Sequence, residues 1–135
     1  MEQKAKDLAL GHRDFEAALA FFLDWPDLGL AADLITARAD ELDGDAYYAL
    51  TPAADALQHE QPLAATLCRR AMIRHTLDKA KSTRYKHAIR HFAKCASADP
   101  DIASYGRFKD HEAFVAELKA RHPRKHGFWS GVESG

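Results

Sequence analysis

Residues 85–92 read Tyr-Lys-His-Ala-Ile-Arg-His-Phe, and the spacing of the apolar residues in this stretch predicts the fold class. Tyr85, Ala88 and Phe92 follow one another at spacings of three and four residues, which places all three on one side of an α-helix. The same large–small–large trio stands 35 and 70 residues earlier, as Leu50, Ala53 and Leu57 and as Phe15, Ala18 and Phe22. Because the small alanine leaves room for a neighbouring helix, the repetition predicts pairs of helices packed against one another.

The composition favours helix along the whole chain. Alanine, the best helix former, makes up about a fifth of the 135 residues, whereas valine occurs only twice. Glycine and proline residues mark the breaks between segments. Pro52 has two interpretations, since it suits the first turn of a helix capped by Thr51 and also a kink within a longer helix. The expected helices are 2–9, 13–24, 27–42, 45–60, 62–79, 84–97 and 110–121.

The end of the chain differs from the rest. We divide the sequence into a single helical-repeat domain, residues 1–122, and a C-terminal tail, residues 123–135. After Gly127 the tail is expected to be extended or frayed. Its adjacent Phe128 and Trp129 are nevertheless expected to dock on the protein, because two large apolar rings are costly to leave in water.

The net charge of −1 hides a segregation of charge along the chain. Residues 1–60 carry four basic residues against thirteen acidic ones, whereas residues 61–98 carry nine basic residues against one acid, Asp78. Two interpretations stay open: the halves attract each other within the fold, or the basic part is a surface for an acidic partner or nucleic acid. The same polarity would permit head-to-tail self-association, weakened by salt.

The sequence predicts a cytoplasmic protein that does not enter a membrane. Its longest apolar run, residues 17–23, is far shorter than the roughly 20 residues that a membrane span needs. Two cysteines are too few for a disulfide framework and are consistent with a reducing compartment.

The chain shows two resemblances to known families. Residues 85–88, Phe92 and the pair Asp99-Pro100 resemble the second helix of a tetratricopeptide repeat, although the preceding helix lacks that repeat's Trp and Leu-Gly pair. The chain from about Asp14 onward also resembles an uncharacterised bacterial all-helical family. The residues that carry this resemblance are 62–67, the helix that begins at Tyr85, and residues 124–129. Similar helices follow the zinc finger of SWIM-type proteins. The finger itself is absent, so its nucleic-acid role does not carry over, and the resemblance implies a short paralogue or a fragment of a longer protein.

Candidate metal ligands and nucleophiles are few. His87, His91 and Cys95 recur every four residues, with Cys68 and His75 on the preceding helix. Imidazole and thiolate suit zinc, but the helix turns Cys95 toward the apolar side and His87 toward solvent. We therefore expect a buried structural cysteine and no metal site. The sequence holds no phosphate-binding glycine loop, nucleophile elbow or zinc-protease pattern, so it predicts neither a cofactor nor an enzyme.

Helix 84–97 is the first candidate binding surface. Arg84, Lys86, Arg90 and Lys94 lie on its outer arc with no acid among them. A phosphate backbone or an acidic protein would use such a row, although no aromatic residue is interleaved to stack on bases. In a solenoid each helix pair touches only its neighbours, so we expect the acidic first half not to reach this arc. A solvated surface is the alternative.

Arg70 and Arg74 are the second candidate. They share an arc of helix 62–79 that would line the concave surface of a solenoid and face a ligand peptide there. The alternative is that they form ion pairs with acids of the preceding repeat, such as Asp33, Asp40 or Glu41.

The expected fold is all-α, with antiparallel helix pairs stacked as a short tetratricopeptide-like superhelix and a compact helical bundle as the alternative. The expected function is a non-catalytic protein–protein interaction or scaffold module, whose unidentified partner would be acidic if it uses the basic surface. The alternative function is a nucleic-acid-binding accessory domain that uses the basic helix 84–97.

Overall fold

The computed structural model describes residues 28–134, and this part of the chain is built of helices. No strand occurs within it, and helices pack in adjacent pairs, which confirms the all-α class. The α-helices are α3 (Leu28–Ala37), α4 (Tyr47–Leu57), α5 (Pro62–Asp78), α6 (Tyr85–Ala98), α7 (His111–Arg121) and α8 (His126–Ser134). The expected helices 2–9 and 13–24, and the trio that begins at Phe15, lie outside the described residues.

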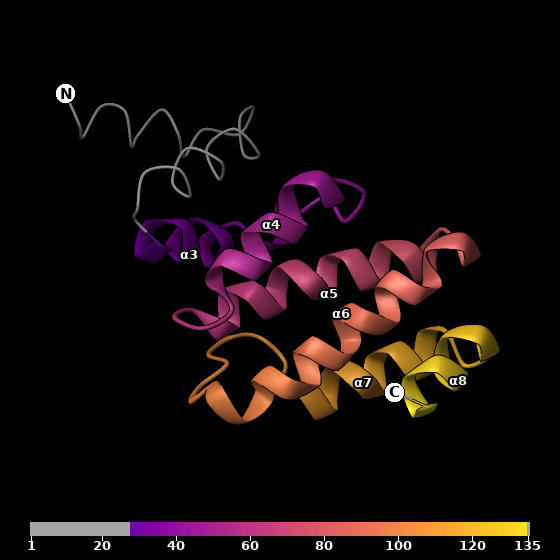
Figure 1. Ribbon diagram of the computed structural model, residues 1–135. Helices are drawn as coiled ribbons and strands as arrows, with labels where there is room; N and C mark the ends of the chain where they lie inside the picture. The colour runs from indigo at the N-terminus through magenta and orange to yellow at the C-terminus, as the bar shows by residue number, and fades with distance from the viewer. Residues whose placement is uncertain (1–27, 135) are drawn as a thin grey trace.

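Helix α5 is the centre of the described structure. Eleven of its seventeen residues are buried, and it packs against α3, α4 and α6. Figure 1 shows α4, α5 and α6 side by side in alternating directions, with α7 and α8 below them. A helix surrounded in this way buries residues on nearly every side, including polar ones, and this arrangement decides the environment of its arginines.

The repeated trios pack as the sequence predicted. Leu50, Ala53 and Leu57 are all buried and belong to the apolar cluster formed by α3, α4 and the first half of α5. Ala88 and Phe92 are buried in a second cluster, formed by the end of α5 together with α6, α7 and α8. Tyr85 packs, partly buried, against this second cluster. The prediction that the small residue of each trio is buried is confirmed at Ala53 and Ala88, while Ala18 is outside the described residues.

The observed helix boundaries agree closely with the predicted ones for α5, α6 and α7 and less well for α3 and α4. Pro62 occupies the first turn of α5, where its missing N–H costs nothing. Pro52 lies inside α4, which supports the second of its two interpretations. The helix expected at 27–42 ends at Ala37 and continues as a short 3-10 helix, Ala39–Glu41.

The turn before α4 is held close to α5 by a glycine. A Cβ at Gly44 would overlap the carbonyl oxygen of Ala71 and the Cβ of His75. Only a residue without a side chain allows this approach, which brings Asp45 to the neighbourhood of His75.

The C-terminal residues are not the extended tail that the sequence suggested. They form α8, which packs against α6, and Phe128 is completely buried. Its ring centroid lies 5.9 Å from that of Phe92, and Trp129 Nε1 donates a 2.8 Å hydrogen bond to the carbonyl oxygen of His122. The expected docking of both aromatic residues is therefore confirmed, and the expectation of a frayed segment is wrong because these rings give α8 an apolar face.

None of the helices between Leu28 and Ser134 has both the length and the apolar character that crossing a membrane requires.

Candidate binding groove between helices α4 and α6

A groove of about 610 Å³ lies between α4 and α6, with α5 as its floor, and we call it the α4–α6 groove. Met72 and Thr76 of α5 line its floor. The α4 side and the turn before it contribute aromatic and small residues, whereas the α6 side is basic. The remaining lining residues are Gly44, Tyr47, Tyr48, Thr51, Pro52, Asp55, Thr83, Arg84, His87, Arg90, His91 and Lys94.

The α4 side of the groove presents two exposed tyrosines. Tyr47 and Tyr48 are 55% and 66% exposed, the large apolar side chains most open to solvent in the described structure. Their ring centroids lie 6.1 Å apart in an edge-to-face arrangement. The guanidinium carbon of Arg84 lies 5.0 Å from the centroid of the Tyr47 ring, so one tyrosine is already engaged by a cation from the opposite side.

Arg84, expected to be exposed for a partner, is paired with an acid of the first half of the chain. Its Nη1 donates a 2.9 Å hydrogen bond to Asp45 Oδ1, and Lys81 Nζ lies 3.5 Å from the same oxygen. The hydrogen bond from Arg84 and the charge of Lys81 lower the pKa of Asp45. His75 Nε2 lies 3.4 Å from this carboxylate as well.

Lys94 is paired in the same way. Its Nζ lies 3.5 Å from Asp55 Oδ1, which also accepts a 3.1 Å hydrogen bond from Arg69. We expected the acidic first half not to reach the outer arc of helix 84–97, and at Arg84 and Lys94 this expectation is wrong. The reason is that α4 and α6 both pack against α5, which brings Asp45 and Asp55 within ion-pair distance of Arg84 and Lys94.

Lys86 and Arg90 behave as the sequence predicted. Both side chains are exposed, and neither forms an ion pair with a carboxylate of residues 28–134. Arg90 lines the α4–α6 groove, whereas Lys86 is not part of its lining. Of the four basic residues expected on this helix, these two keep a charge that no described carboxylate neutralises.

His91 adds a neutral polar group to the basic side of the groove. Burial lowers its pKa from 6.5 to about 4, and the nearby charges of Arg69 and Lys94 act in the same direction. Its Nδ1 is buried without a hydrogen-bond partner among the described residues. Near neutral pH the imidazole is therefore uncharged.

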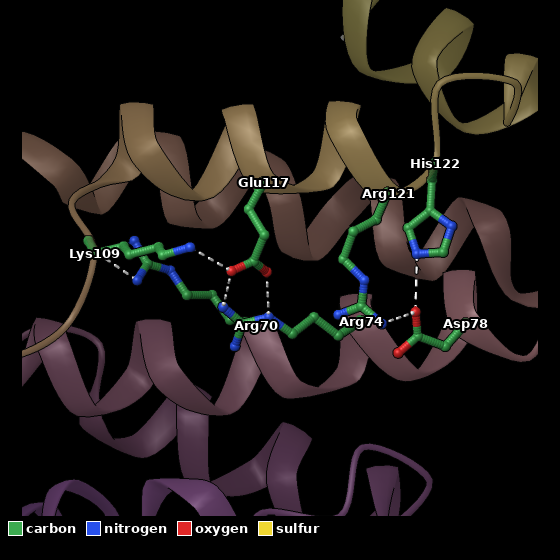
Figure 2. Close-up of polar contacts among 7 residues, drawn as sticks. All are labelled: Arg70, Arg74, Asp78, Lys109, Glu117, Arg121 and His122. Carbon is green, nitrogen blue, oxygen red and sulfur yellow. Dashed lines mark hydrogen bonds and ion pairs between the residues drawn. The ribbon is translucent and has the colours of Figure 1, made fainter.

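Arg74 lies at an interface between α5 and α7 rather than on an open concave surface. Its Nε donates a 2.9 Å hydrogen bond to Glu117 Oε2, and Lys109 Nζ lies 2.9 Å from Glu117 Oε1 (Figure 2). Burial alone would raise the pKa of Glu117, but the hydrogen bonds from Lys109 and Arg74 outweigh it and lower that pKa. Farther along α5, Asp78 lies 3.2 Å from Arg121 and 2.9 Å from His122.

Arg70 is buried, with only 1% of its surface exposed. Its Nη1 donates a 2.6 Å hydrogen bond to the carbonyl oxygen of Lys109, and its guanidinium lies 4.6 Å from the centroid of Phe114. The expected partners Asp33, Asp40 and Glu41 form no ion pair with Arg70 or Arg74 among the described contacts. The segment 102–110 and α7 cover this side of α5, which is why neither arginine faces a peptide site as a solenoid would require.

The cysteines are structural in the described part of the chain. Cys95 is fully buried, its Sγ lies 3.9 Å from the carbonyl oxygen of Thr66, and burial raises its pKa to about 12. Cys68 is buried and free as well, and burial raises its pKa to about 12. Within residues 28–134 no three His, Cys, Asp or Glu side chains are grouped to hold a metal ion, so His87, His91 and Cys95 do not converge on one.

Sequence reasoning missed the α4 side of the groove. It found no aromatic residue on the basic arc because that arc was considered alone, and Tyr47 and Tyr48 come from a different helix. The signal available in the sequence was the pair itself. Adjacent residues of a helix point about 100° apart, so a pair of tyrosines covers a wide arc that extends beyond a narrow buried stripe.

The fold and the groove define an all-helical protein with a basic, aromatic-edged cleft between two neighbouring helices. The chain belongs to the family described as "Family of unknown function (DUF6880)", whose model matches residues 1–131. Comparison with curated proteins and with solved structures found no match for the chain.

Proposed function

We propose that the protein is a non-catalytic interaction module that binds an acidic, partly apolar segment of a partner protein in the α4–α6 groove. The observation that carries the proposal is the lining of this groove: on one side Arg90 has no carboxylate partner among residues 28–134, and on the other side the ring of Tyr47 is about half exposed. An acidic residue of the partner would pair with Arg90, while an apolar residue would pack on the tyrosine.

The charges of the groove support a peptide ligand. Its lining includes three cations, Arg84, Arg90 and Lys94, against one carboxylate, Asp55. Complementary charge raises the rate of association and fixes register, while the buried apolar contact contributes affinity. The floor formed by Met72 suits this contact, because a thioether adapts to irregular apolar shapes.

Nucleic-acid binding is the second candidate, and the structure brings one observation in its favour. Tyr47 and Tyr48 stand across the groove from Arg90, so aromatic and basic groups do occur together. The carboxylates at the groove favour the peptide instead. A nucleic acid carries a negative charge on every phosphate and would meet Asp45 and Asp55 there, whereas a peptide can place a single acidic residue at Arg90 and apolar residues elsewhere.

Three finer assignments belong to the same proposal. The helix pairs form a short tetratricopeptide-like superhelix, supported by the packing of Leu50, Ala53 and Leu57 and of Ala88 and Phe92. The chain is related to the helical region of bacterial SWIM zinc-finger proteins, supported by the resemblances at residues 62–67 and 124–129. It works in the cytoplasm, supported by its two buried free thiols.

The test compares labelled probes by fluorescence anisotropy. The probes are a short peptide that mixes Glu with Phe and Leu, the same peptide with Lys in place of Glu, and a single-stranded oligonucleotide. The acidic peptide should bind the wild-type protein, and Lys86→Glu with Arg90→Glu should reduce its affinity about tenfold or more at low salt. The matched control reverses Lys79 and Arg124, which are exposed cations away from the groove, and should bind like wild type.

Two outcomes would contradict the proposal. Binding of the oligonucleotide alone would replace the peptide function with the nucleic-acid function. Equal loss of peptide binding in the Lys86/Arg90 and Lys79/Arg124 variants would show that the acidic peptide responds to net charge and not to the groove.

A further inference from the structure

A second cavity lies on the other side of α5 and is independent of the groove. Its volume is about 240 Å³, and three segments distant in sequence line it: residues 39–42, residues 67–74 of α5, and residues 107–117. Arg70 lines it, two residues from Met72 of the groove floor and therefore about 200° around the helix. Its charged lining residues are Arg70, Arg74, Arg107, Lys109, Asp40 and Glu117.

The positive charges of this cavity are not balanced by its own acids. Glu117 accepts contacts from both Arg74 and Lys109, each at 2.9 Å. Arg107 instead donates a 2.7 Å hydrogen bond to the carbonyl oxygen of Thr36, and Arg70 donates to the carbonyl oxygen of Lys109. Among the residues that the structure describes, four cations against two carboxylates leave two positive charges uncompensated beside the cavity.

Arg70 is the group that most needs a counter-charge. Its Nε and Nη2 are buried without a hydrogen-bond partner in the described part of the chain, and burial lowers the pKa of this guanidinium. The rings of Phe114 and Tyr105, 4.6 and 5.2 Å from its guanidinium carbon, offset only part of the cost of desolvation. Both nitrogens are closed to solvent, so an anion in the cavity would stabilise Arg70 through the low-dielectric interior and not by direct contact.

We propose that this cavity binds a phosphate group, either free phosphate or the phosphate of a small phosphomonoester. Arg107, Arg74 and Lys109 supply donors for its oxygens, and two uncompensated positive charges match a dianion. A cavity of 240 Å³ holds about eight waters at roughly 30 Å³ each, which leaves room for the group that carries the phosphate. The carboxylate of Asp40, which is exposed, can turn to solvent when the anion enters.

The test is calorimetric titration with inorganic phosphate and with glycerol phosphate at constant ionic strength. Saturable binding is expected for the wild-type protein, and Arg107→Gln should raise the dissociation constant about tenfold or more, the usual effect of losing one charged hydrogen bond. The control Arg124→Gln, at an exposed arginine outside the cavity, should bind like wild type. Equal affinities would identify free phosphate as sufficient, and tighter binding of the ester would identify a phosphomonoester.

A second variant and a second control separate this site from the groove. Arg70→Met replaces the buried guanidinium with an apolar side chain of similar length and should weaken phosphate binding, because it removes one of the positive charges beside the cavity; if it does not fold, Arg107→Gln decides alone. The Lys86→Glu, Arg90→Glu protein should bind phosphate as tightly as wild type, even if the groove proves to bind nothing. Absence of saturable binding, or equal weakening by Arg107→Gln and Arg124→Gln, overturns the proposal.

Discussion

Arg84 and Asp45, 39 residues apart in sequence, are joined by a 2.9 Å hydrogen bond that ties the start of α6 to the turn before α4. The bond accompanies the placement of the Arg84 guanidinium 5.0 Å from the centroid of the Tyr47 ring, at the edge of the α4–α6 groove. Arg84, which the sequence predicted to be available to a partner, therefore has a partner within the fold. Asp45 competes with any acidic ligand for this arginine.

Removing this competitor should strengthen the binding of an acidic peptide. Asp45→Asn keeps the shape of the side chain, removes one negative charge and releases both Arg84 and Lys81. The affinity for the acidic peptide should rise about two- to fivefold at low salt, the scale of one exposed charge pair, as measured by anisotropy. Asp101→Asn, at an exposed acid outside the groove lining, is the control and should change nothing.

Reversing the charge of Lys94 should lower the stability of the folded protein, whereas reversing the charges of Lys86 and Arg90 should not. Lys94→Glu places a carboxylate against Asp55 in place of an ion pair, whereas the other two reversals meet no described carboxylate. Because both partners are about half exposed, the extra loss of stability should stay within about 1 kcal/mol. Urea denaturation compares the Lys86→Glu, Arg90→Glu variant with the same variant that also carries Lys94→Glu, and equal midpoints would argue against the Lys94–Asp55 pair.

The helix crossing at Ala88 should not accept a larger residue. Ala88 is 1% exposed in the cluster that joins α5, α6 and α8, so Ala88→Leu should overpack it and cost about 1–3 kcal/mol. Ala93→Leu, at an exposed position of the same helix, should leave the thermal midpoint nearly unchanged. A similar effect of the two substitutions would mean that the register of α6 is wrong.

The docking of α8 should contribute measurably to stability. Phe128 is fully buried against Phe92 and Trp129, so Phe128→Ala should cost about 3–5 kcal/mol in thermal or urea unfolding. The control is His126→Ala, at an exposed residue of the same helix. If the two variants melt together at the wild-type midpoint, the C-terminal residues do not pack as described.

His91 should make the protein less stable as the solution becomes acidic. Burial lowers its folded-state pKa from 6.5 to about 4, so between these values the unfolded chain binds more protons than the folded one. The stability that the neutral imidazole contributes is therefore present above the pKa of His91 in the unfolded chain. It is lost as the pH falls toward the pKa of His91 in the folded protein. The slope should be a fraction of about 1.4 kcal/mol per pH unit, because solvent screens part of the effect.

His91→Asn should remove this part of the pH dependence, and His59→Asn, at an exposed histidine, should keep it. Urea denaturation between about pH 7 and pH 5 compares the two variants with the wild-type protein. Parallel slopes for all three would show that the imidazole of His91 is as solvated as a free one.

The amino-acid sequence alone was enough to predict the class of the fold and most of its helices. Spacings of three and four residues placed Leu50, Ala53 and Leu57 on one buried stripe, and proline marked the start of α5 at Pro62. These features are local, because a helix is defined by contacts between residues less than two turns apart and its apolar stripe shows which side faces the core. The exposure of Lys86 and Arg90 followed from the same reasoning.

Which charges meet depends on the packing of the helices. Asp45 reaches Arg84, Asp55 reaches Lys94 and Glu117 reaches Arg74 across 39 to 43 residues of chain. A helical period states which side of a helix a residue occupies, but not which helix covers that side. The folding of the 102–110 segment and α7 over α5 buried Arg70, and the placement of α4 beside α6 brought Tyr47 to the basic groove. Both results depend on contacts between helices, for which the pattern within one helix carries no information.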